Sequence, residues 1–138
     1  MYKKILVGYD GSDAGRKAFD TALELAVRDQ SDLYVVTVAR PPEFGDEVET
    51  EAVIENSREH HGKLLAPLQA VASRKNVRAH FELAVGHAAE QIIYHADRHQ
   101  VDLIVVGHRG RSKFARLLLG SVSRQVTEHA DRPVLVVR

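Results

Sequence analysis

Four short runs of apolar, mostly β-branched residues constrain the fold of this chain more than any other feature. They lie at residues 4–8 (KILVG), 33–38 (LYVVTV), 103–107 (LIVVG) and 133–137 (PVLVV). Uninterrupted apolar runs of this length are typical of strands buried on both faces, as in a parallel sheet covered by helices. A fifth stretch, residues 77–83 (VRAHFEL), alternates apolar and polar residues, which indicates a less covered strand near an edge of the sheet.

Helical patterns lie between these runs. After Ser12, a favourable N-cap residue, alanines recur every four residues from position 14 to position 26. A similar apolar stripe covers residues 89–96, and residues 121–130 fit a last short helix. Residues 46–75 form the longest helical segment, in which Pro67 is expected to introduce a kink or to begin a second piece because it lacks an N–H group.

The alternation of strands and helices predicts an α/β fold with an open, doubly wound, Rossmann-like sheet. We expect five parallel strands, right-handed crossovers and helices on both faces. At 138 residues the chain has the usual length of one compact domain, so residues 1–138 are predicted to form a single domain. Ligands of such sheets bind beyond the carboxyl ends of the strands, where the strand order reverses. Two polar, glycine-containing turns, residues 8–12 and 107–110, follow predicted strands and are the candidates for this position.

Composition and charge exclude several function classes. The chain has no cysteine, which excludes disulfides, thiol catalysis and cysteine metal sites. Its 19 basic and 19 acidic residues give a net charge of zero, so no global field favours nucleic acid or a membrane surface. No apolar run approaches the roughly 20 residues that span a bilayer, and the N-terminus has no signal-peptide pattern. We therefore expect a cytoplasmic protein with neither a nucleic-acid nor a membrane partner.

The charges are nevertheless unevenly distributed along the chain. Residues 43–59 carry seven acidic side chains against one basic side chain, which is typical of a solvated loop and helix face. Residues 103–127 contain no acidic side chain but five basic ones, and these basic residues coincide with a cluster of glycines.

The glycines do not fit the two commonest nucleotide-binding motifs. The first turn does not have the G-x-G-x-x-G spacing, and no G-x-x-x-x-G-K-[ST] occurs in the chain. Instead, Gly107 and Gly110 are followed after nine residues by Gly120 and Ser121, between the end of a predicted strand and the start of a predicted helix. Glycines allow a close approach of the backbone to a ligand, and a helix N-terminus favours an anion. The spacing therefore predicts a clamp for a phosphate chain.

Over its whole length the chain resembles the ATP-binding branch of the universal stress protein family. The resemblance rests on the opening KKILVGYDGS, the strand DLYVVTV, the strand and turn VDLIVVGHRG, and the ending LLLGSVSRQVTEHADRPVLVVR, together with a gapless G-2x-G-9x-G-[S/T] pattern. It implies the strand order 3-2-1-4-5, with the first and fourth strands at the switch point. It also implies a regulatory role in the stress response and ATP or AMP as the bound nucleotide.

The same resemblance assigns roles to individual residues. Asp10 is expected to contact the adenosine part of the nucleotide, with Gly8 in the same wall, and Val38 is expected to contact the adenine. Phosphate-binding positions are matched by Gly107, Gly110, Gly120, Ser121 and Val122. From the residues themselves, Asp10 can equally be a turn residue or helix cap before Gly11, and Ser121 can be an N-cap.

Basic side chains and a metal ion are also expected near the phosphates. Arg109 and Arg111 can supply positive charge, although residues 111–116 are expected to form mostly a solvated cover. Mg²⁺ is expected to be held mainly by phosphate oxygens and water, because it tends to keep several waters. His108 is the histidine nearest to the proposed site.

No catalytic residue is predicted, because phosphoryl transfer needs a positioned base or nucleophile and the sequence identifies none. We expect at most slow ATP turnover or autophosphorylation. Two alternatives remain open: a genuine ATPase or nucleotide hydrolase, and a nucleotide-independent protein-interaction module.

The sequence predicts no protein-bound metal. His95 and His99 lie four residues apart on a predicted helix, a spacing at which two imidazoles can share an ion. No glutamate follows His95 as in H-E-x-x-H, and the sequence does not indicate a third ligand.

The last strand bears on assembly. Residues 133–138 (PVLVVR) are expected to form an apolar edge of the sheet, and an uncovered edge is a liability. The family resemblance implies that this edge pairs between two subunits of a homodimer.

Overall fold

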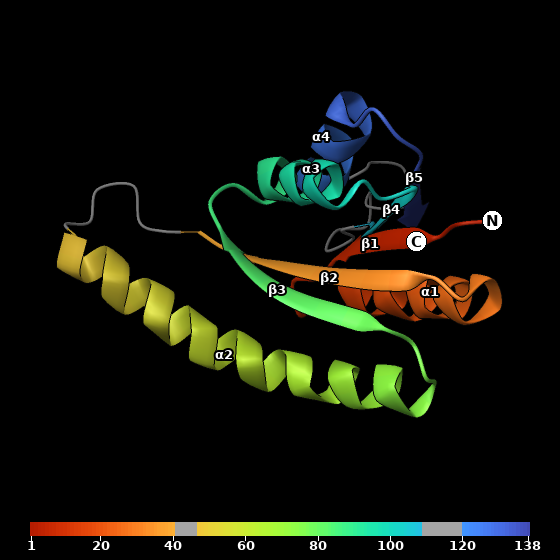
Figure 1. The fold of residues 1–138 in the computed structure, drawn as a ribbon. Helices are drawn as coiled ribbons and strands as arrows, with labels where there is room; N and C mark the ends of the chain where they lie inside the picture. The colour runs from red at the N-terminus through yellow and green to blue at the C-terminus, as the bar shows by residue number, and fades with distance from the viewer. Residues whose placement is uncertain (41–46, 109–119) are drawn as a thin grey trace.

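Five parallel strands form one sheet in the order β3-β2-β1-β4-β5 (Figure 1). The structure is a computed structural model, and it describes residues 1–40, 47–108 and 120–138. The strands are β1 (Lys4–Gly8), β2 (Asp32–Ala39), β3 (Ala79–Val85), β4 (Leu103–Gly107) and β5 (Val134–Val137). The predicted sheet and its strand order are thus confirmed.

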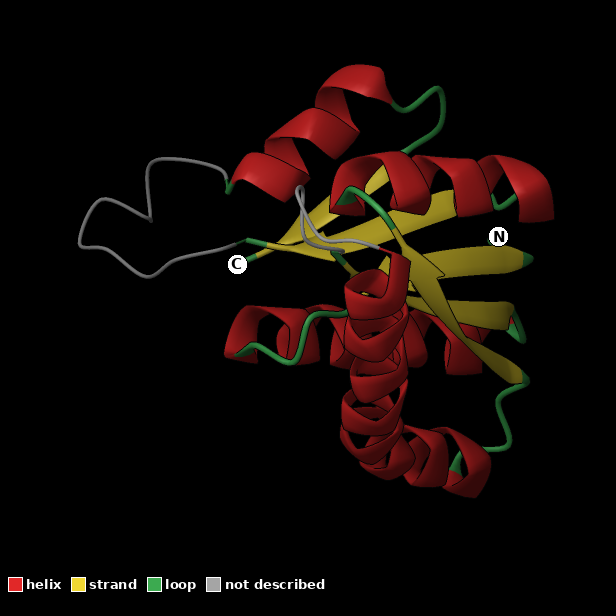
Figure 2. Ribbon diagram, turned by 90° about the vertical axis from the view of Figure 1, so that its left-hand side faces the viewer, coloured by secondary structure: helices red, strands yellow, loops and turns green. Residues whose placement is uncertain are grey.

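Four helices cover the two faces of the sheet. They are α1 (Asp13–Asp29), α2 (Glu47–Arg74), α3 (Ala88–His99) and α4 (Ser121–His129). Figure 1 shows α1 and α2 on one face and α3 and α4 on the other, and Figure 2 shows the same layers from the side. Every connection between parallel strands passes through a helix, as parallel pairing requires.

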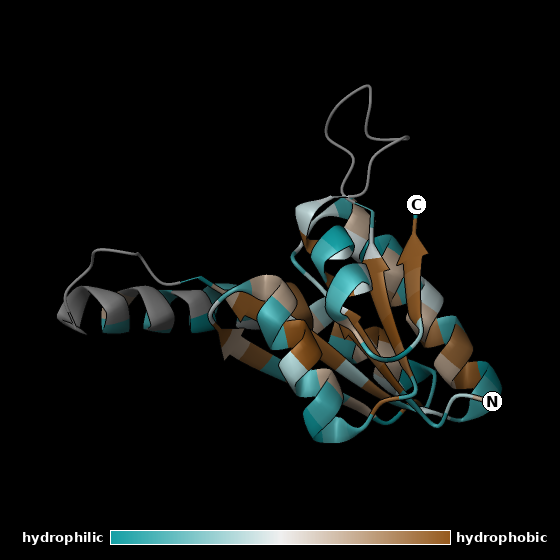
Figure 3. Ribbon diagram, turned by 90° about the horizontal axis from the view of Figure 1, so that it is seen from above, coloured by the Kyte–Doolittle hydropathy of each residue, from teal (hydrophilic) through white to brown (hydrophobic). Residues whose placement is uncertain are grey.

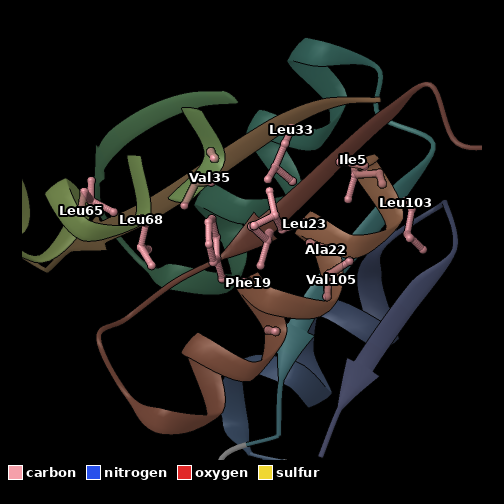
Figure 4. Close-up of a cluster of buried hydrophobic side chains, with 14 residues drawn as sticks. Ile5, Phe19, Ala22, Leu23, Leu33, Val35, Leu65, Leu68, Leu103 and Val105 are labelled. Atoms are coloured by element: carbon pink, nitrogen blue, oxygen red, sulfur yellow. The ribbon is translucent and has the colours of Figure 1, made fainter. Parts of the chain in front are cut away.

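The central strands carry apolar side chains on both faces of the sheet, because each face packs in its own hydrophobic core. Ile5 and Val7 of β1 pack in a cluster with α1 and α2, whereas Leu6 packs in a second cluster with α3 and α4. In Figure 3 the hydrophobic colour is concentrated on the strands, although β3, with the sequence AHFELAV, is mixed. Figure 4 shows the first cluster, in which Phe19 of α1 is fully buried against Val35 and Leu68.

Local signals define the start and end of α1. The hydroxyl oxygen of Ser12, the N-cap residue, accepts a hydrogen bond from the Gly15 N–H at 3.0 Å. Such a cap contributes about 1 kcal/mol to helix stability. The helix ends where Gln30 adopts a left-handed conformation with φ of 55°. The alanine repeat between these points faces the first core, where Ala18, Ala22 and Ala26 are buried.

The long helix α2 continues through Pro67. The alternative in which Pro67 begins a second helix is therefore wrong. Leu65 and Leu68, which lie on either side of Pro67, are buried in the first core, whereas Pro67 itself is exposed. Proline cannot donate the helical hydrogen bond at this position, and the packing of these leucines stabilises the helix there.

The outer strands are β3 and β5. The alternating pattern of residues 77–83 predicts the first, and the strand order implied by the family resemblance predicts the second. The burial on both faces expected for residues 133–137 is wrong, because an edge strand remains partly exposed. Among the described residues, none of the helices is long and apolar enough to cross a membrane.

Truncation of the core aromatic tests the packing. We expect Phe19→Ala to lower the free energy of unfolding by about 3–5 kcal/mol, because it leaves a cavity between α1 and the sheet. Val27→Ala, on the exposed side of the same helix, is the control and should change it by less than about 0.5 kcal/mol. Urea unfolding followed by circular dichroism measures both, and equal effects of the two substitutions would contradict this packing.

Candidate functional site

A cleft of about 220 Å³ lies at the carboxyl ends of β1 and β4, where the strand order reverses. One side is formed by the end of β1 and the start of α1, namely Gly8, Tyr9, Asp10, Ser12, Ala14 and Gly15. The other described residues of its lining come from β2, α3, β4 and α4, namely Val36, Val38, Ala88, Ile92, Val106, Gly107, Val122 and Ser123. The position of the cleft is the one at which doubly wound sheets bind their ligands.

Gly107 brings the end of β4 close to the first turn of α1. A Cβ atom at this position would lie 2.4 Å from the carbonyl oxygen of Ala14 and 3.1 Å from the amide nitrogen of Gly15. Both neighbours are backbone atoms, so they cannot move aside as a side chain can. The glycine at position 107 is therefore required by helix packing, whether or not a ligand also approaches it.

Gly8 makes a similar close approach on the other face of the sheet. A Cβ atom there would lie 2.8 Å from the Cδ1 atom of Ile92 on α3. The two glycines at the ends of β1 and β4 thus allow α1 and α3 to converge on the cleft from opposite faces.

Asp10 shapes the turn between β1 and α1. Its Oδ1 atom accepts hydrogen bonds from the Ser12 N–H, at 2.9 Å, and from the Ser12 hydroxyl. The turn role considered from the sequence is therefore present in this structure. The carboxylate is exposed and belongs to the cleft lining, so its predicted contact with an adenosine remains a prediction.

The wall opposite the polar turn is apolar. Val36 and Val38 of β2 contribute to it together with Ala88 and Ile92 of α3. Val38 is half-buried, and its position in the cleft is the one expected from the family resemblance. A flat apolar ring of a ligand would find its contacts on this wall.

Tyr9 belongs to the cleft lining and packs against the core under α1 and α2. Burial raises the pKa of its hydroxyl, with a smaller opposing effect from Arg16.

The start of α4 forms the remaining side of the cleft. Gly120 is the N-cap residue and Ser121 is the first helical residue, so the alternative of Ser121 as N-cap is not the observed one. Gly120 provides no side-chain cap. The first N–H groups of a helix have no partner within the helix, and together with the helix dipole they favour an anion. Val122 and Ser123 line the cleft at this point.

Some of the predicted residues lie outside the described part of the chain. These are Arg109, Gly110, Arg111 and the expected cover over residues 111–116. His108, the last described residue before them, is 7% exposed, and its backbone N–H donates to the Val137 carbonyl at 2.7 Å.

Sequence reasoning missed several residues of the cleft. Ile92 was assigned only to a helical stripe, and Ala88, Tyr9 and Gly15 were given no role. No local motif marks the first two, because only the crossover of α3 over the sheet brings them to β1. Gly15 follows the serine N-cap by three residues, and this spacing was detectable in the sequence. In the structure, a Cβ atom at position 15 would lie 2.8 Å from Asp10 Oδ1.

The fold and the cleft define a class, the doubly wound α/β proteins with a ligand site at the switch point of the sheet. The comparison with known families is more specific. Residues 1–138 match the model of the universal stress protein family, and the chain belongs to that family. It is 37% identical to universal stress protein YxiE of Bacillus subtilis (strain 168), with each chain covered completely.

Solved structures agree with this assignment. Universal stress protein UspA from Lactobacillus plantarum has a TM-score of 0.87 and 29% identity, with 99% of this chain and 98% of that chain covered. A universal stress protein solved in complex with cAMP has a TM-score of 0.68 and 27% identity, with 99% and 97% covered. That protein holds its adenine nucleotide on a fold that this chain shares.

Two glycine-to-alanine substitutions test the contact between β4 and α1. Gly107→Ala should lower the free energy of unfolding by about 1–3 kcal/mol, because its methyl group overlaps the backbone of α1. Gly62→Ala, on α2 where a Cβ atom would meet nothing within 4 Å, should instead raise it by up to about 1 kcal/mol. Chemical denaturation measures both changes. A neutral or stabilising Gly107→Ala would contradict the close approach.

Proposed function

We propose that this chain binds an adenine nucleotide, ATP or AMP, in the cleft between β1 and β4. In this proposal it acts as a regulatory module of the stress response in the cytoplasm. The cleft itself carries the proposal, because an apolar wall, a polar turn and an uncapped helix N-terminus face one space. The cAMP complex of a structural relative supports the choice of an adenine nucleotide.

Each part of the cleft suits one part of the nucleotide. The adenine would pack on the wall that contains Val38 and Ile92, since aromatic rings are bound through apolar contact. Asp10 would accept hydrogen bonds from the ribose hydroxyls. The phosphates would lie between Gly107 and the start of α4, where Gly120, Ser121 and Val122 are placed, with Gly110 and Arg109 completing the clamp.

Mg²⁺ fits this cleft only as a companion of the phosphates. Among the described lining residues, Asp10 carries the one carboxylate, and its Oδ1 atom already accepts hydrogen bonds from Ser12. Mg²⁺ prefers an octahedron of oxygen ligands and keeps several waters. Asp10 would at most orient one of those waters, and the ion would neutralise phosphate charge.

The proposed role is binding rather than catalysis. Among the described lining residues there is no histidine or lysine, and the one carboxylate, Asp10, is assigned to the ribose rather than to a nucleophile at the phosphates. Steady ATP turnover above a few per minute that is lost in Asp10→Ala or His108→Ala would favour the hydrolase instead.

Nucleotide binding is tested with the purified full-length chain. Isothermal titration calorimetry with ATP and AMP should give a Kd in the micromolar range, equivalent to about 8 kcal/mol. The double substitution Gly110→Val and Gly120→Val should weaken binding at least tenfold, because it fills the predicted clamp. Gly120 has φ of −64°, which any residue adopts, so valine at position 120 changes space rather than backbone conformation.

Gly62→Ala provides the matched control, because it alters an exposed glycine of α2 and should leave the Kd unchanged. Mass spectrometry of any nucleotide released by heat would distinguish ATP from AMP. Absence of adenine-nucleotide binding, or equal binding by the double variant, would refute the proposal and favour an interaction module.

We also propose a homodimer that pairs β5 across a two-fold axis. This strand is an edge of the sheet, and Leu135 is 37% exposed on it. An exposed apolar edge favours pairing with another strand. Light scattering at micromolar concentration should give twice the 15.4 kDa of one chain, and Leu135→Lys should shift the mass toward one chain. A monomeric wild-type protein would contradict this assembly.

A further inference from the structure

Three metal-binding side chains meet on the sheet face covered by α3, away from the residues that line the cleft. They are Glu82 of β3 and His95 and His99 of α3, and their ligand atoms all lie within 4.8 Å of one another. We propose that this cluster is a binding site for a divalent transition-metal ion, with Zn²⁺ as the preferred ion. The proposal is independent of nucleotide binding.

The topology explains how the third ligand arises. Side chains alternate along β3, and Glu82 pairs in register with Val36, which packs in the core beneath α3. Glu82 therefore points to the α3 face of the sheet. His95 and His99 are one helical turn apart on α3, and the helix crosses this part of the sheet. The ligand that the sequence could not supply comes from a strand 13 residues upstream of His95.

The distances are close to those that an ion requires. The Nδ1 atom of His95 lies 2.8 Å from Oε2 of Glu82, and the Nε2 atom of His99 lies 2.9 Å from Oε1. Ligand atoms around tetrahedral Zn²⁺ lie about 3.4 Å apart, given bond lengths near 2.1 Å. Separations that now range from 2.8 Å up to at most 4.8 Å would therefore have to change by roughly 0.6 to 1.4 Å to admit the ion. Two imidazoles and one carboxylate form an established zinc donor set.

The carboxylate of Glu82 holds both histidines together without an ion. Nε2 of His99 is hydrogen-bonded to Oε1, and the buried Nδ1 atom of His95 has Oε2 as its close neighbour. A bound ion would replace these two contacts.

Neighbouring groups hold the histidines in place. The ring of Tyr34 on β2 stacks on that of His99 with a centroid distance of 4.1 Å, and Lys4 donates to the His99 carbonyl at 3.2 Å. Fixed ring orientations of this kind raise the affinity of a metal site. Glu82 remains 29% exposed at the edge of the sheet, so solvent can supply a fourth ligand.

A bound ion would fasten α3 to the edge strand β3. It would add to the apolar contact that Ala84 of β3 makes with Ala89 and Ile92 of α3. With three protein ligands and one water, the ion would have an open fourth position.

The direct test uses the full-length protein after removal of metals with a chelator. Titration with Zn²⁺ in the calorimeter should show one ion per chain with a Kd at or below about 10 µM. Co²⁺ should give the intense visible absorption of a tetrahedral site. Glu82→Gln and His99→Gln should each weaken Zn²⁺ binding at least about tenfold, since each removes a ligand.

Two histidine variants are matched controls. His129→Gln alters an exposed histidine of α4, and His80→Gln alters a neighbour that contacts Tyr34 but is not a ligand. Both should bind Zn²⁺ like the wild type. Circular dichroism of the metal-free variants separates loss of a ligand from loss of the fold.

A second measurement needs no variant at all. In the wild-type protein, Zn²⁺ should shift the imidazole resonances of His95 and His99 at one equivalent and leave that of His129 unchanged. Failure to bind one equivalent in the micromolar range, unchanged binding by Glu82→Gln, or a first shift at other histidines would overturn the proposal.

Discussion

The divergence of the chain at the ends of β1 and β4 is the constraint on which the cleft depends. These two strands are neighbours, yet β1 leads to α1 on one face of the sheet while the crossover after β4 leads to α4 on the other. In the described part of the chain, the cleft lies between these two connections. The backbone groups there must find partners in side chains, solvent or a ligand. The right-handed crossover rule thus creates the site before any specific residue is chosen.

Glycines in this region serve the fold, whether or not a ligand also approaches them. Gly107 removes an overlap with the backbone of α1, and Gly8 removes one with Ile92. Asp10 similarly organises the turn that caps α1 through Ser12. A motif read as a ligand signature can therefore persist for reasons of packing. A loss of binding in a variant at such a position is informative only when the stability of the variant is known.

Most of the fold could be predicted from the sequence because the strands β1, β2 and β4 are largely buried, which leaves a clear apolar pattern. Residues 4–8 and 103–107 match β1 and β4 to the residue. The order of the strands came from the family resemblance, since periodicity does not specify neighbours. Pro67 shows the opposite case, in which the burial of Leu65 and Leu68 outweighs a local helix-breaking signal. For the cleft, polar turns were predictable, whereas the wall from α3 depends on tertiary packing.

The helix α3 contributes residues both to the cleft and to the cluster of Glu82, His95 and His99. Its first turns supply Ala88 and Ile92 to the cleft, and its last turn carries His99. At that last turn, Arg132 donates to the carbonyls of Ala96 and Val101 at 2.7 and 3.0 Å, and Lys4 donates to that of His99.

The Ala96 carbonyl already accepts from the N–H groups of Gln100 and Val101, so Arg132 adds a charged donor to it. Both cations suit the negative end of the helix dipole. These contacts add to the burial of Ala89, Ile92 and Ala96 in the second core, which holds α3 on the sheet. The helix side of the cleft wall thus rests on apolar packing along α3 and on polar contacts at its end.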